Sequence, residues 1–286
     1  MHFAQSGFLC VKAGNRYETG KEKGIMCELY CIPMLERLED YVAFSKEYQA
    51  GFEYNDFYVP ALLDDEVAKE RAIRRYLGTG RDCSQDTMHG VFLDVCVNST
   101  DPKIFAVSDY RIRQCMDIAK KIGIKAVIFH TNYIVNFLLQ SYIDTWLKRN
   151  EEYWRKILRD YPEQKIYIEN MFDEAPILLR QLARNMSDEK RFGVCLDVAH
   201  AFISGSPLEP WFTALHPYIK HVHINDNDGR EDLHLAVGCG SFDWEEYDQW
   251  GRSLDEKPSI LIEVRSLADL RGSVEYMERH KIFPFG

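Results

Sequence analysis

Eight short apolar runs alternate with longer segments of helical periodicity, and this alternation restricts the fold of the 286-residue sequence more than any other feature. Each run is short enough to be a buried β-strand, and the segments between the runs are long enough to hold a helix. The predicted strands are residues 25–32, 51–54, 88–95, 126–130, 165–169, 193–197, 219–224 and 260–264.

Helical spacing separates these runs. After the first run, Leu35, Leu38 and Val42 recur every three or four residues, and the stretch Asp243-Trp-Glu-Glu246 has the form of a capping box. A strand followed by a helix eight times over roughly 250 residues predicts an α/β protein with a (β/α)8 TIM barrel in a single domain. A doubly wound open sheet is the alternative, and it is weakened because no strand precedes a GxGxxG motif.

The domain boundaries follow from the same pattern. Residues 1–24 contain four glycines and mixed charges with little periodicity, so we expect an irregular N-terminal arm. Residues 25–286 carry the regular alternation and contain no linker or internal repeat. At 46% hydrophobic residues, the chain can bury the core of one large domain.

Composition indicates an acidic protein of a reducing compartment. The net charge of -10 argues against a nucleic-acid partner, because binding to phosphates usually needs a basic face. The eight cysteines form no CxxC pair, which favours buried thiols over a disulfide framework. No apolar run approaches the roughly 20 residues of a membrane span, and Met1–Val11 lacks the basic start of a secretory signal. We therefore expect a cytoplasmic protein without membrane contact.

Six of the eight predicted strands, the third through the eighth, carry a potential metal ligand. The active sites of such barrels lie at the carboxyl ends of the strands, where these side chains would meet. A single histidine beside a strand is most often structural, but independent accidents would not all fall at one end of one barrel. In chain order, the strand residues are His89, His130, Glu169, Asp197, His223 and Glu263, and the following loops add His200, Asp232 and His234.

Carboxylate oxygen and imidazole nitrogen together suit divalent transition ions, and the absence of clustered cysteines argues against a thiolate zinc site. Four successive strands would place Glu169, Asp197, His223 and Glu263 around one ion. The other five residues have two open interpretations: they complete sites for a second and a third ion, or they support the first site and contact substrate. We expect one to three ions of Mn2+, Zn2+ or Co2+.

Several motifs resemble those of the xylose isomerase-like TIM-barrel superfamily, which contains sugar isomerases, sugar epimerases and the endonuclease IV type of DNA-repair nuclease. The resemblance covers most of the chain, and its motifs are LDVAHAF, HVHIND, DLHLAVGCG, IEN and LIEV. In the epimerases, the residues that match Glu169, Asp197, His223 and Glu263 bind one divalent metal, and the two glutamates act as acid and base. In the nucleases, residues that match the other five candidates complete a three-zinc cluster.

The first functional hypothesis is a metal-dependent isomerase or epimerase of a sugar, sugar phosphate or polyol. Glu169 and Glu263 would transfer the proton on either side of an enediolate that the metal stabilises. We expect His200, His221 and Arg230 to contact the substrate, although His221 is equally suited to support His223 from behind.

The alternatives are a zinc phosphodiesterase that acts on abasic DNA, like endonuclease IV, and a barrel that binds a metal and a ligand without turnover. The acidic balance and the lack of a Lys/Arg-rich run near the barrel mouth rank sugar chemistry above DNA repair. A barrel without turnover would leave Glu169 and Glu263 with no acid-base role. The partner that we expect is therefore a small sugar or polyol rather than nucleic acid, and the sequence leaves the oligomeric state open.

Overall fold

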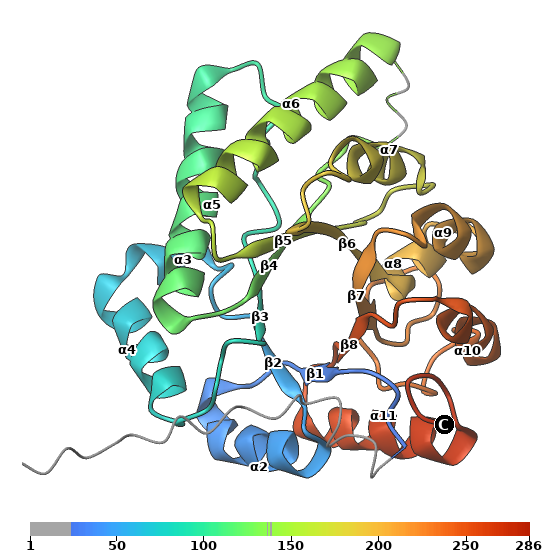
Figure 1. The fold of residues 1–286 in the computed structure, drawn as a ribbon. Helices are drawn as coiled ribbons and strands as arrows, with labels where there is room; N and C mark the ends of the chain where they lie inside the picture. The colour runs from blue at the N-terminus through green and yellow to red at the C-terminus, as the bar shows by residue number, and fades with distance from the viewer. Residues whose placement is uncertain (1–23, 136, 138) are drawn as a thin grey trace, which may run out of the picture.

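A closed barrel of eight parallel strands is the architecture of this protein (Figure 1). The computed structural model describes residues 24–135, 137 and 139–286, so the predicted arm of residues 1–24 lies outside these residues except for Gly24. Each strand pairs with the next in the chain, and β1 pairs with β8 to close the sheet. The predicted (β/α)8 TIM barrel is confirmed. The strands are β1 Leu29–Cys31, β2 Gly51–Tyr54, β3 Thr87–His89, β4 Ala126–His130, β5 Lys165–Glu169, β6 Phe192–Asp197, β7 Ile219–Ile224 and β8 Ser259–Ile262.

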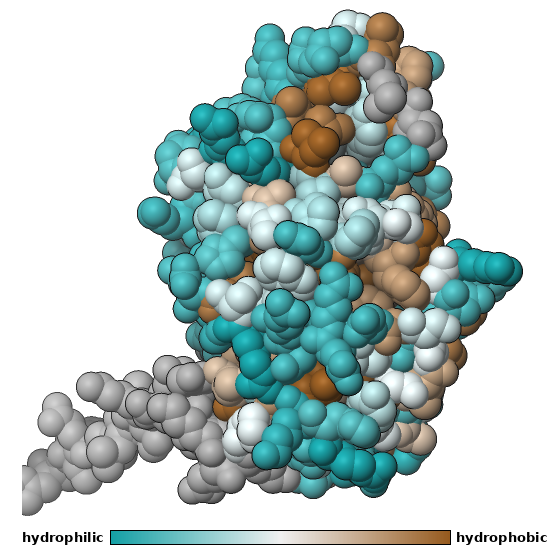
Figure 2. All heavy atoms as spheres, turned by 90° about the vertical axis from the view of Figure 1, so that its right-hand side faces the viewer, coloured by the Kyte–Doolittle hydropathy of each residue, from teal (hydrophilic) through white to brown (hydrophobic). Residues whose placement is uncertain are grey.

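Helices surround the barrel as an outer ring (Figure 1), and one side of this ring presents a mainly hydrophilic surface (Figure 2). Side-chain caps mark several helix starts: Asp65, Asp101 and Asp243 each accept backbone N–H groups of the first turn. The helices are η2 Leu35–Arg37, α2 Leu38–Tyr48, α3 Pro60–Asp64, α4 Glu66–Leu77, α5 Pro102–Ile122, α6 Gln140–Asp160, α7 Ile177–Asn185, α8 Val198–Ile203, α9 Leu208–Leu215, α10 Trp244–Ser253 and α11 Leu267–His280.

The strand bounds differ from the predicted ones mainly in β1, β3 and β8. The strand predicted over residues 88–95 ends at His89. The next residue, Gly90, still donates its backbone N–H to the carbonyl of Ile128. Beyond it, Asp94 adopts a positive φ of 61°, which turns the chain away from the sheet. β8 ends at Ile262, so Glu263 follows the strand instead of lying within it. An apolar run in the sequence therefore overstates the length of a strand where the chain bends out of the sheet.

The main core lies between the strands and the outer helices. Three tryptophans, Trp146, Trp154 and Trp211, are fully buried in it, and the Phe129 ring of β4 packs 5.1 Å from that of Trp154 on α6. The seven cysteines of the described part carry free thiols. None of the helices found in residues 24–135 and 139–286 has the length and apolar character needed to cross a bilayer.

Close packing between β1 and β2 gives the first prediction. A Cβ atom at Gly51 would lie 2.4 Å from the ring of Tyr30, whose hydroxyl donates to the carbonyl of Gln85. We expect Gly51→Ala to lower the free energy of unfolding by about 1–3 kcal/mol in urea titrations, because the ring must move. Gly272→Ala on α11 is the matched control: nothing lies within 4 Å, and a gain of about 0.5–1 kcal/mol is expected. Equal stability of the two variants would contradict this packing.

Candidate metal centre

The mouth of the barrel holds a pocket of about 550 Å³ at the carboxyl ends of the strands. Asp197 and His223 lie beneath its surface with fully buried side chains. The remaining candidate ligands predicted from the sequence line the pocket itself, namely His89, His130, Glu169, His200, Asp232, His234 and Glu263. The fold thus brings all nine predicted ligands to one place.

Alternation along the strands explains why these side chains meet. Successive residues of a strand point to opposite faces, so every second residue points into the barrel. On β4, Ala126 and Ile128 belong to a small apolar cluster separate from the main core, and His130 continues the same face at the strand end. On β5, Tyr167 belongs to this cluster and Glu169 follows in the same way. The apolar positions thus fill part of the barrel interior, and the polar side chains at the strand ends line the pocket above it.

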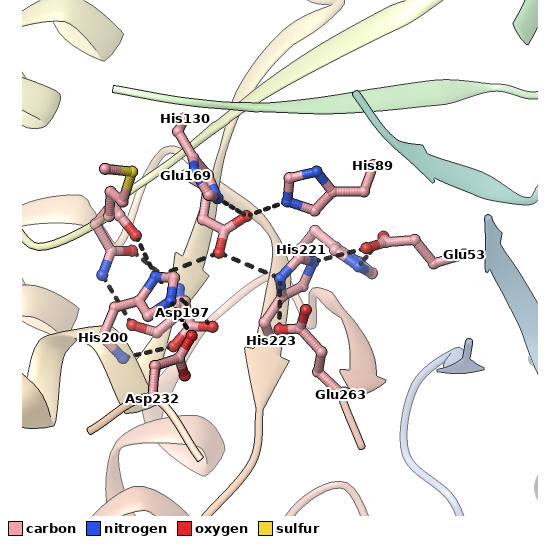
Figure 3. A network of polar contacts seen from close by, with 12 residues as sticks. Glu53, His89, His130, Glu169, Asp197, His200, His221, His223, Asp232 and Glu263 are labelled. Atoms are coloured by element: carbon pink, nitrogen blue, oxygen red, sulfur yellow. Dashed lines mark hydrogen bonds and ion pairs between the residues drawn. The ribbon is translucent and has the colours of Figure 1, made fainter. Parts of the chain in front are cut away.

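Glu169 stands at the centre of the polar residues (Figure 3). Its Oε2 lies 3.4 Å from the Nε2 atoms of both His89 and His130. Its Oε1 lies 3.3 Å from Nδ1 of His223 and 3.5 Å from Nδ1 of His200. The two oxygens of one carboxylate therefore face two different groups of imidazoles.

One group consists of Glu169, Asp197, His223 and Glu263, whose ligand atoms all lie within 4.8 Å of one another. Nδ1 of His223 is 3.3 Å from Oε2 of Glu263, the same distance as from Glu169. These residues come from the ends of β5 to β8, as the sequence predicted.

A second group combines His89, His130 and Glu169, again within 4.8 Å. Nδ1 of His89 contacts the carbonyl of Gly90 at 2.8 Å, which leaves Nε2 to face the carboxylate. The geometry of this group fits a second ion that shares Glu169.

The third group gathers around Asp232 in the loop after β7. Its Oδ2 lies 2.9 Å from Nε2 of His234 and 3.5 Å from Nε2 of His200. Nδ1 of His200 contacts the carbonyl of Asn170 at 2.8 Å, so the ring presents its other nitrogen to Asp232.

The chemistry of these groups fits divalent ions. Oε2 of Glu169, Oδ2 of Asp197 and Nδ1 of His223 are buried without a hydrogen-bond partner. Burial by itself would raise the pKa of Glu169, but the imidazoles of His223 and His130 outweigh it and hold that pKa well below its usual range. Burial raises the pKa of Asp197 to about 7, against the opposing effect of His200 and with added repulsion from Glu169. Buried carboxylates this close together are costly without a cation between them.

Two polar side chains hold the ligand-bearing segments in place. Asn170 joins the ends of β5 and β6: its amide donates to the carbonyl of Asp197 at 2.8 Å and accepts the Asp197 N–H at 2.9 Å. Asp226 is fully buried and accepts from the N–H groups of Asn227, Gly238 and Phe242 and from the indole of Trp244. Asp226 therefore ties together both ends of the loop that carries the third group.

Two residues predicted to contact substrate lie elsewhere. His221 has no exposed surface, and its ring contacts Glu53 and Ser259 below the pocket. Arg230 is exposed on the loop after β7 and is absent from the pocket wall. His200, the third of the residues predicted to contact substrate, does line the pocket.

The sequence analysis missed several residues of this region. Glu53 is fully buried in the short run GFEY, where a charged residue between two aromatic residues was the available signal. Tyr58 and Arg265 line the pocket from loops whose spacing gave no indication of their position.

A closed parallel barrel whose strand ends converge on carboxylates and imidazoles is a TIM barrel with a candidate metal centre. A family model described as "Xylose isomerase-like TIM barrel" matches residues 46–280, so the chain belongs to this family, as the motifs predicted.

Relatives in this family differ in what they are called. The uncharacterized protein MJ1614 of Methanocaldococcus jannaschii is 25% identical over 189 residues, which is 64% of this chain and 72% of that protein. A probable endonuclease 4 of Mycobacterium leprae is 28% identical over 201 residues, covering 65% of this chain and 72% of that protein.

Solved structures share the fold at lower identity. The TTHB071 protein of Thermus thermophilus, soaked with ZnCl2, has a TM-score of 0.67 at 22% identity, and the match covers 88% of this chain and 97% of that protein. A D-tagatose 3-epimerase-like protein has a TM-score of 0.68 at 21% identity, covering 88% and 96%. These similarities establish the barrel fold, and the reaction has to be inferred from the geometry of the site.

The role of Asp226 can be tested by removing its carboxylate. We expect Asp226→Ala to lower the free energy of unfolding by about 2–4 kcal/mol, because several buried donors lose their acceptor. Amide hydrogen exchange should accelerate at Gly238 and Phe242 before the rest of the barrel opens. Unchanged protection at these two amides would contradict this role.

Metal binding can be tested through stability. Chelation should lower the melting temperature. Zinc at 100-fold above its Kd should then raise the free energy of unfolding by about 2.7 kcal/mol, because the ion binds only the folded protein. Metal analysis should then find more than one ion per chain. Glu169→Ala is the control that should lose the response to zinc, and a wild-type melting temperature indifferent to both treatments would contradict a metal centre.

Proposed function

We propose that this protein is a divalent-metal-dependent hydrolase that cleaves a phosphate diester. The observation that carries this proposal is the position of Glu169, whose two oxygens face separate groups of ligands. A carboxylate in this position suits a bridge between two ions, which is the arrangement used to stabilise both the attacking and the leaving oxygen of a phosphoryl displacement.

The roles of the residues follow from their positions. His89, His130 and Glu169 would hold one ion, and Asp197, His223 and Glu263 would complete the site of a second with Glu169. When bound, these ions supply Lewis-acid activation of water and of the phosphate oxygens. His200, Asp232 and His234 suit a third ion, or they orient the substrate phosphate above the first two.

Glu263 is the residue best placed to accept a proton. Its side chain retains 10% exposure at the pocket wall, whereas that of Glu169 retains 1%. We assign to a carboxylate oxygen of Glu263 the proton of the attacking water. Glu169 then acts as a ligand and not as a base.

This proposal reverses the ranking that the sequence favoured. An epimerase needs one ion and two glutamates that each exchange a proton with the substrate, whereas both oxygens of Glu169 face imidazole nitrogens. The net charge of -10 weighed against DNA, yet ions at the floor of the pocket would supply positive potential where a phosphate binds.

The pocket wall also suits a nucleic-acid substrate. Met34, Tyr58 and Phe92 line it beside the polar centre, and the rings of Tyr58 and Phe92 lie 4.8 Å apart. Apolar and aromatic side chains can contact bases or a sugar next to the scissile phosphate. The relative called probable endonuclease 4 supports duplex DNA with an abasic site as the first substrate to test.

A sugar isomerase or epimerase is the second candidate. Glu169 and Glu263 lie at equal distances of 3.3 Å from Nδ1 of His223, as a pair of proton-transfer groups around one ion would. Barrels of the same fold include an L-ribulose 3-epimerase and a D-allulose 3-epimerase from Methylomonas in complex with D-allulose. Under this second function His130 would have no essential role.

His130→Ala therefore separates the two functions. We expect the variant to cleave an abasic-site duplex at least about 100-fold more slowly than the wild type, because a ligand is lost. Glu263→Gln should lower the rate by about 10²- to 10⁴-fold, because the proton acceptor is lost. Both rates are measured on the zinc-loaded enzyme in parallel with a panel of ketohexoses.

The contrary outcomes are distinct. Epimerisation of a ketohexose with His130→Ala fully active, and no DNA cleavage, would replace the proposal with the epimerase. Neither activity in a zinc-loaded protein that still binds a ligand would indicate a barrel without turnover.

A further inference from the structure

A second polar layer lies inside the barrel, directly beneath the metal centre. Glu53 on β2 and His221 on β7 have no exposed side-chain surface, and neither lines the pocket. We propose that Glu53 is a positioning residue: it holds the ring of His223 so that the lone pair of Nδ1 faces Glu169 and Glu263, and it thereby sets the affinity for the metal.

The first step of the argument concerns the two nitrogens of His223. Nδ1 faces the carboxylates of Glu169 and Glu263, so it is the atom that binds an ion. A neutral imidazole that binds metal through one nitrogen carries its proton on the other. That proton is therefore on Nε2, which lies 3.2 Å from Oε1 of Glu53 (Figure 3).

The second step concerns the surroundings of this contact. His223 and Glu53 are both fully buried, and neither Nε2 of the ring nor Oε1 of the carboxylate has a regular hydrogen-bond partner among the described residues. Because no such partner competes for these two atoms, a small rotation of the ring lets Nε2–H donate to Oε1. A carboxylate in this position fixes the ring and increases the basicity of Nδ1.

The third step shows that Glu53 is itself held. The hydroxyl of Thr87 on β3 donates to Oε2 at 2.7 Å, and Nε2 of His221 lies 3.2 Å from the same oxygen. Nδ1 of His221 contacts Oγ of Ser259 on β8 at 2.6 Å. Contacts from β3 and β7 thus keep the carboxylate under His223, and Ser259 of β8 holds His221 in turn, as precise orientation of a ligand requires.

Two other roles for Glu53 remain to be separated by experiment. It can be a purely structural partner of two buried histidines, or a ligand of an ion of its own, since Glu53, His221 and His223 offer atoms within 4.8 Å of one another. A structural role acts on stability alone. A ligand role changes the number of ions at saturation.

The test compares Glu53→Gln and Glu53→Leu with the wild type. Zinc affinity is measured by competition with a chromogenic chelator, the number of ions by metal analysis at saturation, and folding by circular dichroism. We expect the Kd of the ion bound by His223 to rise about 10-fold in Glu53→Gln, which keeps an acceptor oxygen, and about 100-fold in Glu53→Leu. The number of ions should stay the same, and the absorption spectrum of the Co2+-loaded protein should shift as the ring tilts.

Asp86→Asn is the matched control. Asp86 is also a fully buried carboxylate of the barrel, but it precedes β3 at the opposite end, where it accepts from the N–H of Phe52 and the hydroxyl of Tyr54. This variant should lower the melting temperature and leave the zinc Kd unchanged. Thr87→Val keeps the charge of Glu53 and removes one of its contacts, so a smaller, few-fold rise in Kd is expected even if Glu53→Leu does not fold.

A zinc Kd within twofold of the wild type in Glu53→Gln would overturn the proposal in favour of a structural role. The loss of one ion at saturation would overturn it in favour of a ligand role. Because these measurements use the metal alone, they are independent of the proposed hydrolysis: either conclusion can fail while the other stands.

Discussion

Mutual repulsion among buried carboxylates is the constraint on which the rest of this structure depends. Glu169, Asp197 and Glu263 converge at the floor of one pocket, and Glu53 lies below them with no exposed surface. Imidazoles offset part of this repulsion, but burial, together with repulsion from Glu169 and Glu263, still raises the pKa of Asp197 to about 7. Divalent ions in this pocket would offset the rest of the repulsion, so metal binding and the stability of the barrel mouth would be aspects of one electrostatic balance.

The closed sheet produces this convergence and also limits it. Parallel pairing aligns the strand ends at one rim, and alternation sends every second side chain inward. The interior thus holds a small apolar cluster that includes Ile128, and a polar layer of Glu53 and His221 beneath the candidate ligands. This polar layer cannot meet substrate, so its effect on chemistry has to pass through the residues above it, and His223 contacts both.

The reaction proposed for the site follows from how ligands are shared. Four residues around one ion fit proton transfer between two glutamates, and the sequence alone ranked that chemistry first. The structure brings His89 and His130 to the second oxygen of Glu169, and in the proposed hydrolase this glutamate would serve as a shared ligand and not as a base. One side chain cannot hold two ions and exchange a proton with substrate, and this exclusivity separates the hydrolase from the epimerase.

The sequence by itself determined the barrel and its nine candidate ligands, because hydrophobic periodicity and polar strand ends are local patterns that survive without coordinates. It did not determine where β3 ends, since the residues after His89 remain largely apolar in sequence while Asp94 turns the chain. Nor did it reveal Glu53 below the site or remove Arg230 from it. Only the tertiary structure decided the end of β3 and the positions of Glu53 and Arg230. They depend on the stagger of neighbouring strands and on which atom of a side chain faces which partner. Distances between residues remote in sequence leave no trace in local spacing.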